Sequence, residues 1–105
     1  MKVLFICNQG KNRSRTASEI FKDKFKTKFA GLYAEAPVSE REISWADIIF
    51  VMEDWQRSEL GKRFPGLYLK KQIISLDIPD IYFFNQPELV ELLKRKMDEA
   101  ILTIH

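Results

Sequence analysis

The chain has 105 residues, of which 46% are hydrophobic and 30% charged, a composition that predicts one soluble globular domain and excludes disorder of the whole chain. A net charge of +2, from 17 Lys and Arg against 15 Asp and Glu, permits an anionic ligand without indicating nucleic acid. The single cysteine excludes an internal disulfide and is typical of a reducing compartment. With no apolar run long enough for a membrane span and no signal-peptide pattern, we expect a cytoplasmic protein that does not bind membranes.

The chain opens with an apolar run, Val3 to Ile6, followed by a polar loop from Cys7 to Ser14 and then by a helical pattern. Apolar β-branched and aromatic residues, a loop with glycine and a helical pattern predict the order strand, loop, helix. Such a loop brings several backbone N–H groups and a helix N-terminus to one point. It is therefore a candidate binding site for an anion such as phosphate.

Hydrophobic spacing predicts the next elements. Apolar residues at three- and four-residue steps predict an amphipathic helix from about Ser14 to Lys28. We expect a short second strand at 32–34 and a polar connector over 37–42. The continuous apolar run 48–52 predicts a strand that is covered on both faces.

The second half of the chain predicts two helices and one strand. Asp54 is a candidate cap for a helix that continues to about Lys62, and a turn at 64–66 follows. The run 72–76 predicts the last strand. Pro87 marks the start of the final helix, whose apolar stripe predicts core positions at Leu89, Val90, Leu93, Met97 and Ile101.

Strands that alternate with helices predict an α/β fold, with an open four-stranded parallel sheet and helices on both faces. The sequence contains no internal repeat or linker, so residues 1–105 are predicted to form a single domain. Ligands of such sheets bind outside the carboxyl ends of the strands. We therefore expect the loops 7–13, 53–55 and 77–82 to share one edge, which would bring Cys7 and Asp80 together.

Two residues of the first loop suggest nucleophilic chemistry on phosphate. A cysteine attacks as its thiolate, a form favoured by backbone N–H groups, a helix start and a nearby cation. The loop supplies all three around Cys7. Arg13 offers a planar fork of donors that can hold two oxygens of a phosphoryl group. The structural alternatives are a small buried core residue for Cys7 and a helix-surface residue for Arg13.

The spacing Cys-x5-Arg-Ser behind a hydrophobic strand resembles that of the low-molecular-weight protein tyrosine phosphatases. The block from Trp45 to Met52 is similar to that family's third strand and its approach, and Ile-Pro-Asp-Ile-Tyr at 78–82 resembles its Asp-Pro-Tyr acid loop. The three blocks occur in the family's order and span most of the chain. The resemblance implies a reduced, phosphatase-like domain. It also implies a hydrolase that works through a phosphocysteine without a cofactor.

The resemblance also implies roles for individual residues. Cys7 would be the nucleophile, Ser14 would donate to its sulfur, and Arg13 would bind the phosphoryl group. Asp80 would act as general acid and then as general base. The phosphate-binding loop would consist of Asn8, Gln9, Gly10, Lys11, Asn12 and Arg13.

Two assignments depend on the acid loop. Asp77 is the rival of Asp80, which we prefer because Pro79 precedes it and Tyr82 lies two residues beyond, as in the family. A turn-forming role is the structural alternative for either aspartate. Tyr82 and Trp55 are the candidate walls of the substrate pocket. No cluster of metal ligands is evident, and His105, the only histidine, has no assigned role.

The loop departs from the family pattern. Gln9 and Gly10 stand at the family's Gly-Asn positions, so the asparagine that props the loop is missing, although Gly10 reaches positive φ without strain. Asn12 replaces the second loop cysteine, which excludes a disulfide within the loop, and Arg15 replaces a proline. The connector before 45–52 is short, so the substrate wall is reduced. Phosphate-monoester hydrolysis is therefore a firmer expectation than phosphotyrosine specificity.

The sequence is also compatible with functions other than hydrolysis. Arsenate reduction needs further cysteines, and a phosphocarrier would have little use for Arg13 or Asp80. The alternative from a different class is a non-catalytic phosphate- or phosphopeptide-binding module, in which a reactive thiol has little purpose. The expected substrate is a phosphorylated protein or a small phosphate ester.

Overall fold

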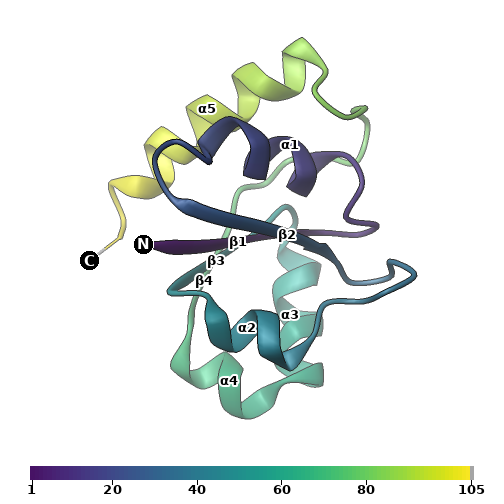
Figure 1. Ribbon diagram of the computed structural model, residues 1–105, viewed down its shortest axis with the longest axis vertical. Coiled ribbons are helices and arrows are strands. Elements are labelled where there is room, and N and C mark those ends of the chain that lie inside the picture. Colours follow the sequence, from purple (N-terminus) through teal and green to yellow (C-terminus); the bar gives the residue numbers. More distant parts are fainter. Residues whose placement is uncertain (105) are drawn as a thin grey trace.

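The computed structural model describes residues 1–104. Within these residues no helix is long and apolar enough to cross a membrane. Strands and helices alternate along most of the chain (Figure 1). Their order is β1 (Lys2–Cys7), α1 (Arg13–Phe21), β2 (Lys26–Gly31), α2 (Glu40–Trp45), β3 (Ile48–Val51), α3 (Asp54–Arg63), α4 (Pro65–Lys70), β4 (Gln72–Ser75) and α5 (Pro87–Ile101).

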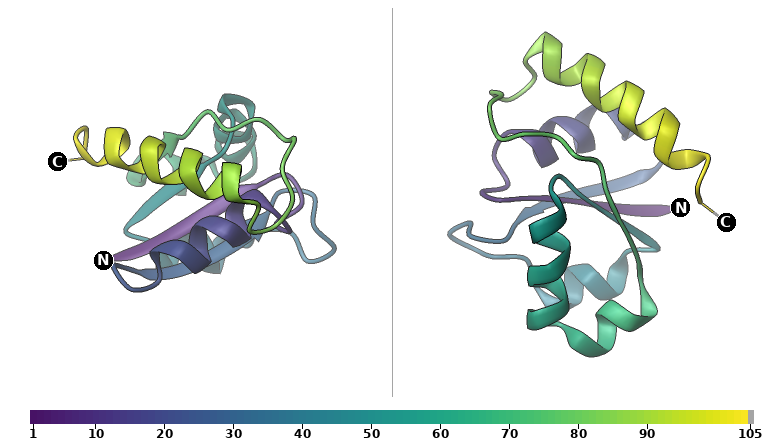
Figure 2. Two further views of the ribbon diagram at one scale, coloured as in Figure 1. Left: turned by 90° about the horizontal axis from the view of Figure 1, so that it is seen from above. Right: turned by 180° about the vertical axis from the view of Figure 1, so that it is seen from behind.

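The four strands form one sheet in the order β2-β1-β3-β4, and all neighbouring strands are parallel. Helices α1 and α5 cover one face, and α2, α3 and α4 cover the other (Figures 1 and 2). The predicted α/β fold with a four-stranded parallel sheet is confirmed. Side chains of β1 alternate between two core clusters: Val3, Phe5 and Cys7 face α1 and α5, whereas Leu4 and Ile6 face the opposite layer.

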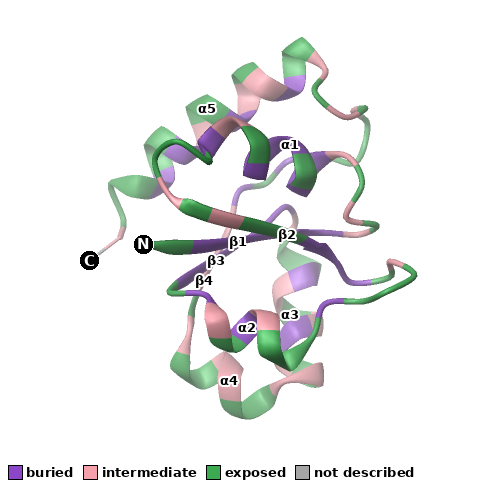
Figure 3. Ribbon diagram, viewed as in Figure 1, coloured by how far each residue is buried: buried purple, intermediate pink, exposed green. Residues whose placement is uncertain are grey.

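The two central strands are buried along almost their whole length (Figure 3). This burial explains their continuous apolar runs, because a strand covered on both faces has no solvent side. Phe5 of β1 stacks on Phe50 of β3 and on Phe21 of α1, with ring centroids 5.6 and 6.0 Å apart. These contacts fix the strand that leads into the candidate phosphate-binding loop.

The prediction for residues 14–34 is wrong in two places. Helix α1 ends at Phe21 rather than at Lys28, and the second strand is Lys26–Gly31 rather than 32–34. Lys26 and Lys28 are exposed on this edge strand, where lysines discourage pairing with other chains. The aromatic residues at 21, 25 and 29 mimic helical spacing, but Phe25 packs on the core from the turn after α1 and Phe29 is exposed.

Two short helices were not predicted. The supposed connector contains a capping box in which Ser39 and Glu42 bond reciprocally, and it starts α2. The supposed turn at 64–66 leads into α4, with Pro65 in its first turn.

Two details of the longer helices also need correction. The residue that precedes α3 as its N-cap is Glu53, and Asp54 is the first helical residue. In α5 the buried stripe is Leu89, Leu93, Met97 and Ala100. Each helical residue advances about 100° around the axis, which places Val90 and Ile101 to one side of that stripe. They are half-buried and exposed, respectively.

Asp47 ties the start of β3 to the start of β1. Its carboxylate accepts a hydrogen bond of 2.8 Å from the backbone N–H of Lys2, and its own N–H donates to the Lys2 carbonyl. The Lys2 N–H lowers the pKa of Asp47 below its ordinary value of 3.8, and the positive charges of Lys2, the N-terminus and Lys71 add to the effect.

Asp47→Asn should therefore lower the melting temperature at about pH 7, where the carboxylate is ionised in both states. Because the folded-state pKa is the lower one, the stabilisation is present above the unfolded-state pKa and is lost as the pH falls through the folded-state value. The difference between wild type and variant should therefore shrink as the pH is lowered from about 7 into the acid range. Asp98→Asn, which removes an exposed carboxylate from α5, is the control. A difference that stays constant with pH would contradict the assignment.

Candidate active site

The loops after β1, β3 and β4 meet at one edge of the sheet, as predicted. Arg13 joins all three. Its Nη1 donates to Glu53 Oε1 at 2.5 Å and to the Ile78 carbonyl at 2.7 Å. Its Nε lies 3.6 Å from Asp80 Oδ1. The Arg13 side chain is therefore held by residues that lie 40 to 67 positions further along the chain.

Cys7 ends β1 with only 3% of its surface exposed. Its Sγ accepts a hydrogen bond of 3.1 Å from the Gly10 N–H and lies 3.0 Å from Ser14 Oγ. Ser14 Oγ is also within 3.3 Å of the Ala30 carbonyl. A thiolate can only accept hydrogen bonds, so an ionised Cys7 would take the Ser14 proton away from that carbonyl. Two donors are thus available to a negative sulfur.

The candidate phosphate-binding loop, residues 8–13, lies directly on the end of β2. Gly10 has a left-handed φ of 70°, as the sequence suggested. A Cβ on Gly10 would be 2.8 Å from the Gly31 nitrogen, and a Cβ on Gly31 would be 2.4 Å from the Gln9 carbonyl carbon. The carbonyls of Cys7 and Asn8 accept from the N–H groups of Leu32 and Tyr33 at 3.0 and 2.8 Å. Close backbone contact therefore fixes the loop without the family's asparagine.

The start of α1 is open toward this loop. Asn12 is the N-cap residue but makes no side-chain capping bond, and the first turn carries no acidic residue. The N–H groups of the first turn are therefore free of a capping carboxylate or amide. Gln9 and Lys11 are exposed on the outer side of the loop, and Asn8 is half-buried. This arrangement suits an anion that is bound by backbone N–H groups.

Arg13 is 1% exposed, the most deeply buried charged side chain among residues 1–104. Glu53 and Ile78 both bind Nη1. The opposite edge of the guanidinium carries Nη2 and Nε, and Nε faces Asp80 Oδ1 at 3.6 Å, which is too long for a hydrogen bond. A guanidinium edge of this kind can form two parallel hydrogen bonds to a phosphoryl group. The surface-arginine alternative is therefore wrong for this residue.

Asp80 and Asp77 have different surroundings. Asp80 is 53% exposed and faces the Arg13 guanidinium. Asp77 is exposed, has a left-handed φ of 56° and lies just after β4. Aspartate is one of the residues that tolerate this conformation in turns. Of the two aspartates, Asp80 is therefore the one that lies beside Arg13, and Asp77 occupies a turn conformation.

Sequence reasoning missed the importance of Glu53. Its Oε1 binds Arg13, and its Oε2 accepts a hydrogen bond of 3.2 Å from the Trp55 indole N–H. Buried Gln56 holds the turn by accepting from the N–H groups of Met52 and Glu53 at 2.8 and 3.0 Å. The spacing Glu-x-x-Gln directly after a buried strand was the available signal, because it is a helix-start pattern.

Trp55, one of the two predicted pocket residues, forms an aromatic wall with Tyr33. The rings stack with centroids 6.2 Å apart, and the Arg63 guanidinium lies 4.9 Å from the centroid of Tyr33. Tyr33 is linked to the phosphate-binding loop through its bond to the Asn8 carbonyl. It was not predicted as a site residue, because its segment was assigned to a strand.

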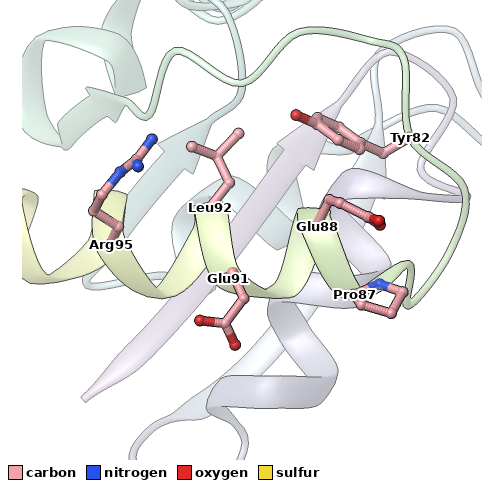
Figure 4. Close-up of a pocket in the computed structure, with 6 residues that line it drawn as sticks. All are labelled: Tyr82, Pro87, Glu88, Glu91, Leu92 and Arg95. Carbon is pink, nitrogen blue, oxygen red and sulfur yellow. The ribbon is translucent and has the colours of Figure 1, made fainter.

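Tyr82, the second predicted pocket residue, lies against α5. Its ring packs on the core cluster beneath α1 and α5. It also lines a groove of about 580 Å³ together with Pro87, Glu88, Glu91, Leu92 and Arg95 (Figure 4). The two predicted pocket residues therefore have separate neighbours. Within residues 1–104, no group of three or more His, Cys, Asp or Glu side chains is arranged to hold a metal ion.

Comparison with protein-family models and with curated proteins finds no match to this sequence. Solved structures do resemble the chain. A low-molecular-weight protein tyrosine phosphatase from T. tengcongensis superposes with a TM-score of 0.78 at 18% identity, covering 99% of both chains. The tyrosine phosphatase AmsI from Erwinia amylovora gives 0.79 at 15% identity, covering 98% of this chain and 92% of the other. The arginine phosphatase YwlE from Geobacillus stearothermophilus gives 0.70 at 19%, covering 99% and 97%. The chain has the low-molecular-weight phosphatase fold.

Glu53→Gln should destabilise the protein, because it removes the charge that compensates buried Arg13. We expect a loss of about 1–3 kcal/mol in the free energy of unfolding, together with weaker binding of inorganic phosphate. Chemical denaturation and phosphate titration measure the two effects.

Glu59→Gln is the matched control. It breaks the more exposed pair of Arg63 Nε with Glu59 at 2.8 Å. A pair of this kind contributes about 0.3–0.5 kcal/mol. Equal losses in the two variants would contradict a special role for Glu53.

Proposed function

We propose that this protein is a cysteine-dependent phosphatase that hydrolyses phosphate monoesters through a phosphocysteine on Cys7. The observation that carries the proposal is that three groups lie at the same edge of the sheet, around residues 7–14. These are the Cys7 sulfur with its two donors, the buried Arg13 guanidinium and the uncapped start of α1. The fold of the tyrosine and arginine phosphatases described above supports it.

In the first step, the Cys7 thiolate attacks phosphorus in line with the leaving oxygen. The S–P bond forms and the P–O bond to the leaving group breaks, with its electron pair going to oxygen. Asp80 in its acid form protonates that oxygen. Arg13 and the loop N–H groups hold the phosphoryl oxygens, whose charge is redistributed in the transition state.

In the second step, water replaces the thiol. The Asp80 carboxylate takes a proton from water, whose oxygen attacks phosphorus. The S–P bond breaks, and its electron pair returns to sulfur as inorganic phosphate leaves. Ser14 Oγ and the Gly10 N–H stabilise the thiolate that forms, which makes sulfur a better leaving group.

The substrate proposed is an aryl phosphate, such as phosphotyrosine on a protein or a small aryl ester. The stacked rings of Trp55 and Tyr33 beside the phosphate-binding loop offer a flat apolar wall to an aromatic leaving group. A reactive thiol needs reducing surroundings, so the cytoplasm is the proposed location. Residues 1–105 would act as one catalytic domain without a cofactor.

Wild type and Cys7→Ser should differ completely in hydrolysis of an aryl phosphate in metal-chelating buffer. The wild type should release phosphate, and the variant should release none, because a serine hydroxyl lacks the nucleophilicity of a thiolate. Suppose instead that the wild type is inactive, yet vanadate protects Cys7 from alkylation. The phosphatase proposal would then fail, and a phosphate-binding module would replace it.

Asp80→Asn and Asp77→Asn should separate the two candidate acids. The first change should lower kcat for esters with poor leaving groups by about 10²- to 10⁴-fold, and vanadate should still protect Cys7. The second should leave kcat within about threefold, because asparagine also tolerates left-handed φ. The reverse pattern in the measured rates would assign the acid to Asp77.

A further inference from the structure

The segment that carries Asp80 is bounded by two residues in the left-handed conformation. Asp77 has a φ of 56° and Asn85 a φ of 59°. Figure 2 shows the segment running from the end of β4 to the start of α5. At its first end, buried Ile78 donates its N–H to the Met52 carbonyl at 2.7 Å and offers its own carbonyl to Arg13. Its middle, from Asp80 to Phe83, is largely exposed.

The second end of this segment is held by the first turn of α1. The Phe84 N–H donates to Asn12 Oδ1 at 3.1 Å, and the Asn85 N–H donates to Thr16 Oγ1 at 2.8 Å. The Arg15 guanidinium lies 3.9 Å from the centroid of the Phe84 ring. Two adjacent backbone N–H groups of the acid-loop segment thus bond to side chains at the end of the phosphate-binding loop and in the first turn of α1.

These bonds form a connected set. Thr16 is fully buried, and its hydroxyl donates to the Asn12 carbonyl at 2.7 Å while it accepts from Asn85. A hydroxyl has one proton and two acceptor lone pairs, so it can make both bonds at once. The side-chain oxygen of Asn12 is the remaining link. A cysteine at this position, as in the resembling family, would offer only a weak acceptor.

We propose that Asn12 and Thr16 are positioning residues that hold the acid-loop segment, and with it Asp80, over the phosphate-binding loop. The two hydrogen bonds from Phe84 and Asn85 to these side chains form what we call the tether. Its effect on catalysis rests on the proposed phosphatase function. Neither side chain needs to touch the substrate. They set the position from which Asp80 reaches the leaving oxygen, because both ends of the segment are then fixed to the Arg13 region.

The first test measures amide hydrogen exchange in the intact protein and needs no turnover. Asn12→Ala should accelerate exchange at Phe84, and Thr16→Val should do so at Asn85, each by about two- to tenfold, the effect of losing one hydrogen bond. Thr16→Ser keeps the hydroxyl and should restore slow exchange at Asn85. Unchanged exchange at these two amides would overturn the proposal.

Gln86→Ala is the matched control. Gln86 Oε1 accepts from the Phe83 N–H at 3.0 Å, so this variant also loses one bond to a neighbouring amide, but from the α5 side. Exchange should accelerate at Phe83 and remain slow at Phe84 and Asn85. Equal acceleration at all three amides in every variant would indicate general loosening of the loop and would overturn the tether.

The second test varies the leaving group. A nitrophenyl phosphate depends little on a general acid, whereas an ester with a more basic leaving oxygen depends on it strongly. Thr16→Val, which changes a residue outside the phosphate-binding loop, should lower kcat about tenfold or more for the basic leaving group and at most about threefold for nitrophenyl phosphate. Thr16→Ser should recover the wild-type ratio. Vanadate should protect Cys7 equally in all of them.

The two tests separate this proposal from the function on which its catalytic part rests. If the wild type hydrolyses no ester, the phosphatase proposal is wrong. In that case the amide hydrogen exchange measurements alone test whether the tether exists. A loss of kcat that is equal for both leaving groups, in variants with faster exchange, would overturn the positioning of Asp80. Loss of vanadate protection in Thr16→Val would show that the change disturbs anion binding itself, and it would overturn a role limited to positioning Asp80.

Discussion

Burial of the Arg13 charge is the constraint on which the rest of the site depends. A guanidinium that is 1% exposed is tolerated only if its charge and its donors are matched. Glu53 and the Ile78 carbonyl supply that match, with Asp80 nearby, and they come from the loops after β3 and β4. Compensation of one charge therefore draws three loops to the same edge. The opposite edge, where Asp80 lies 3.6 Å from Nε, is the edge that we propose for anion binding.

The strands that could be predicted are those whose hydrophobic pattern corresponds to their burial in the fold. β1 and β3 are buried on both faces, and their continuous apolar runs record that burial. The edge strand β2 could not be recognised, because its lysines face solvent and its aromatic residues fall at helical spacing by coincidence. Helices α2 and α4 have six residues each, too few for a hydrophobic period to stand out.

The same distinction applies to the site. Cys7, Gly10, Arg13 and Ser14 belong to one continuous loop, so their spacing by itself was informative. The roles of Glu53, Tyr33 and Asn12 depend on partners that lie 25 to 72 residues away in sequence. The neighbours of Tyr82 could not be predicted for a related reason, because the packing of α5 decides where its ring lies. The spacing of residues within one segment does not predict contacts with residues that are distant in sequence.

The absence of side chains at Gly10 and Gly31 links anion binding to the stability of the sheet edge. The loop contacts Gly31, the last residue of β2, directly through its backbone. The loop can therefore adopt this conformation only when the end of β2 is paired in the sheet. A ligand that binds the loop only in this conformation also stabilises the end of β2 on which the loop rests, by mass action. Phosphate at the site would therefore suppress local unfolding of an exposed edge strand, the part of a sheet most prone to pair with other chains.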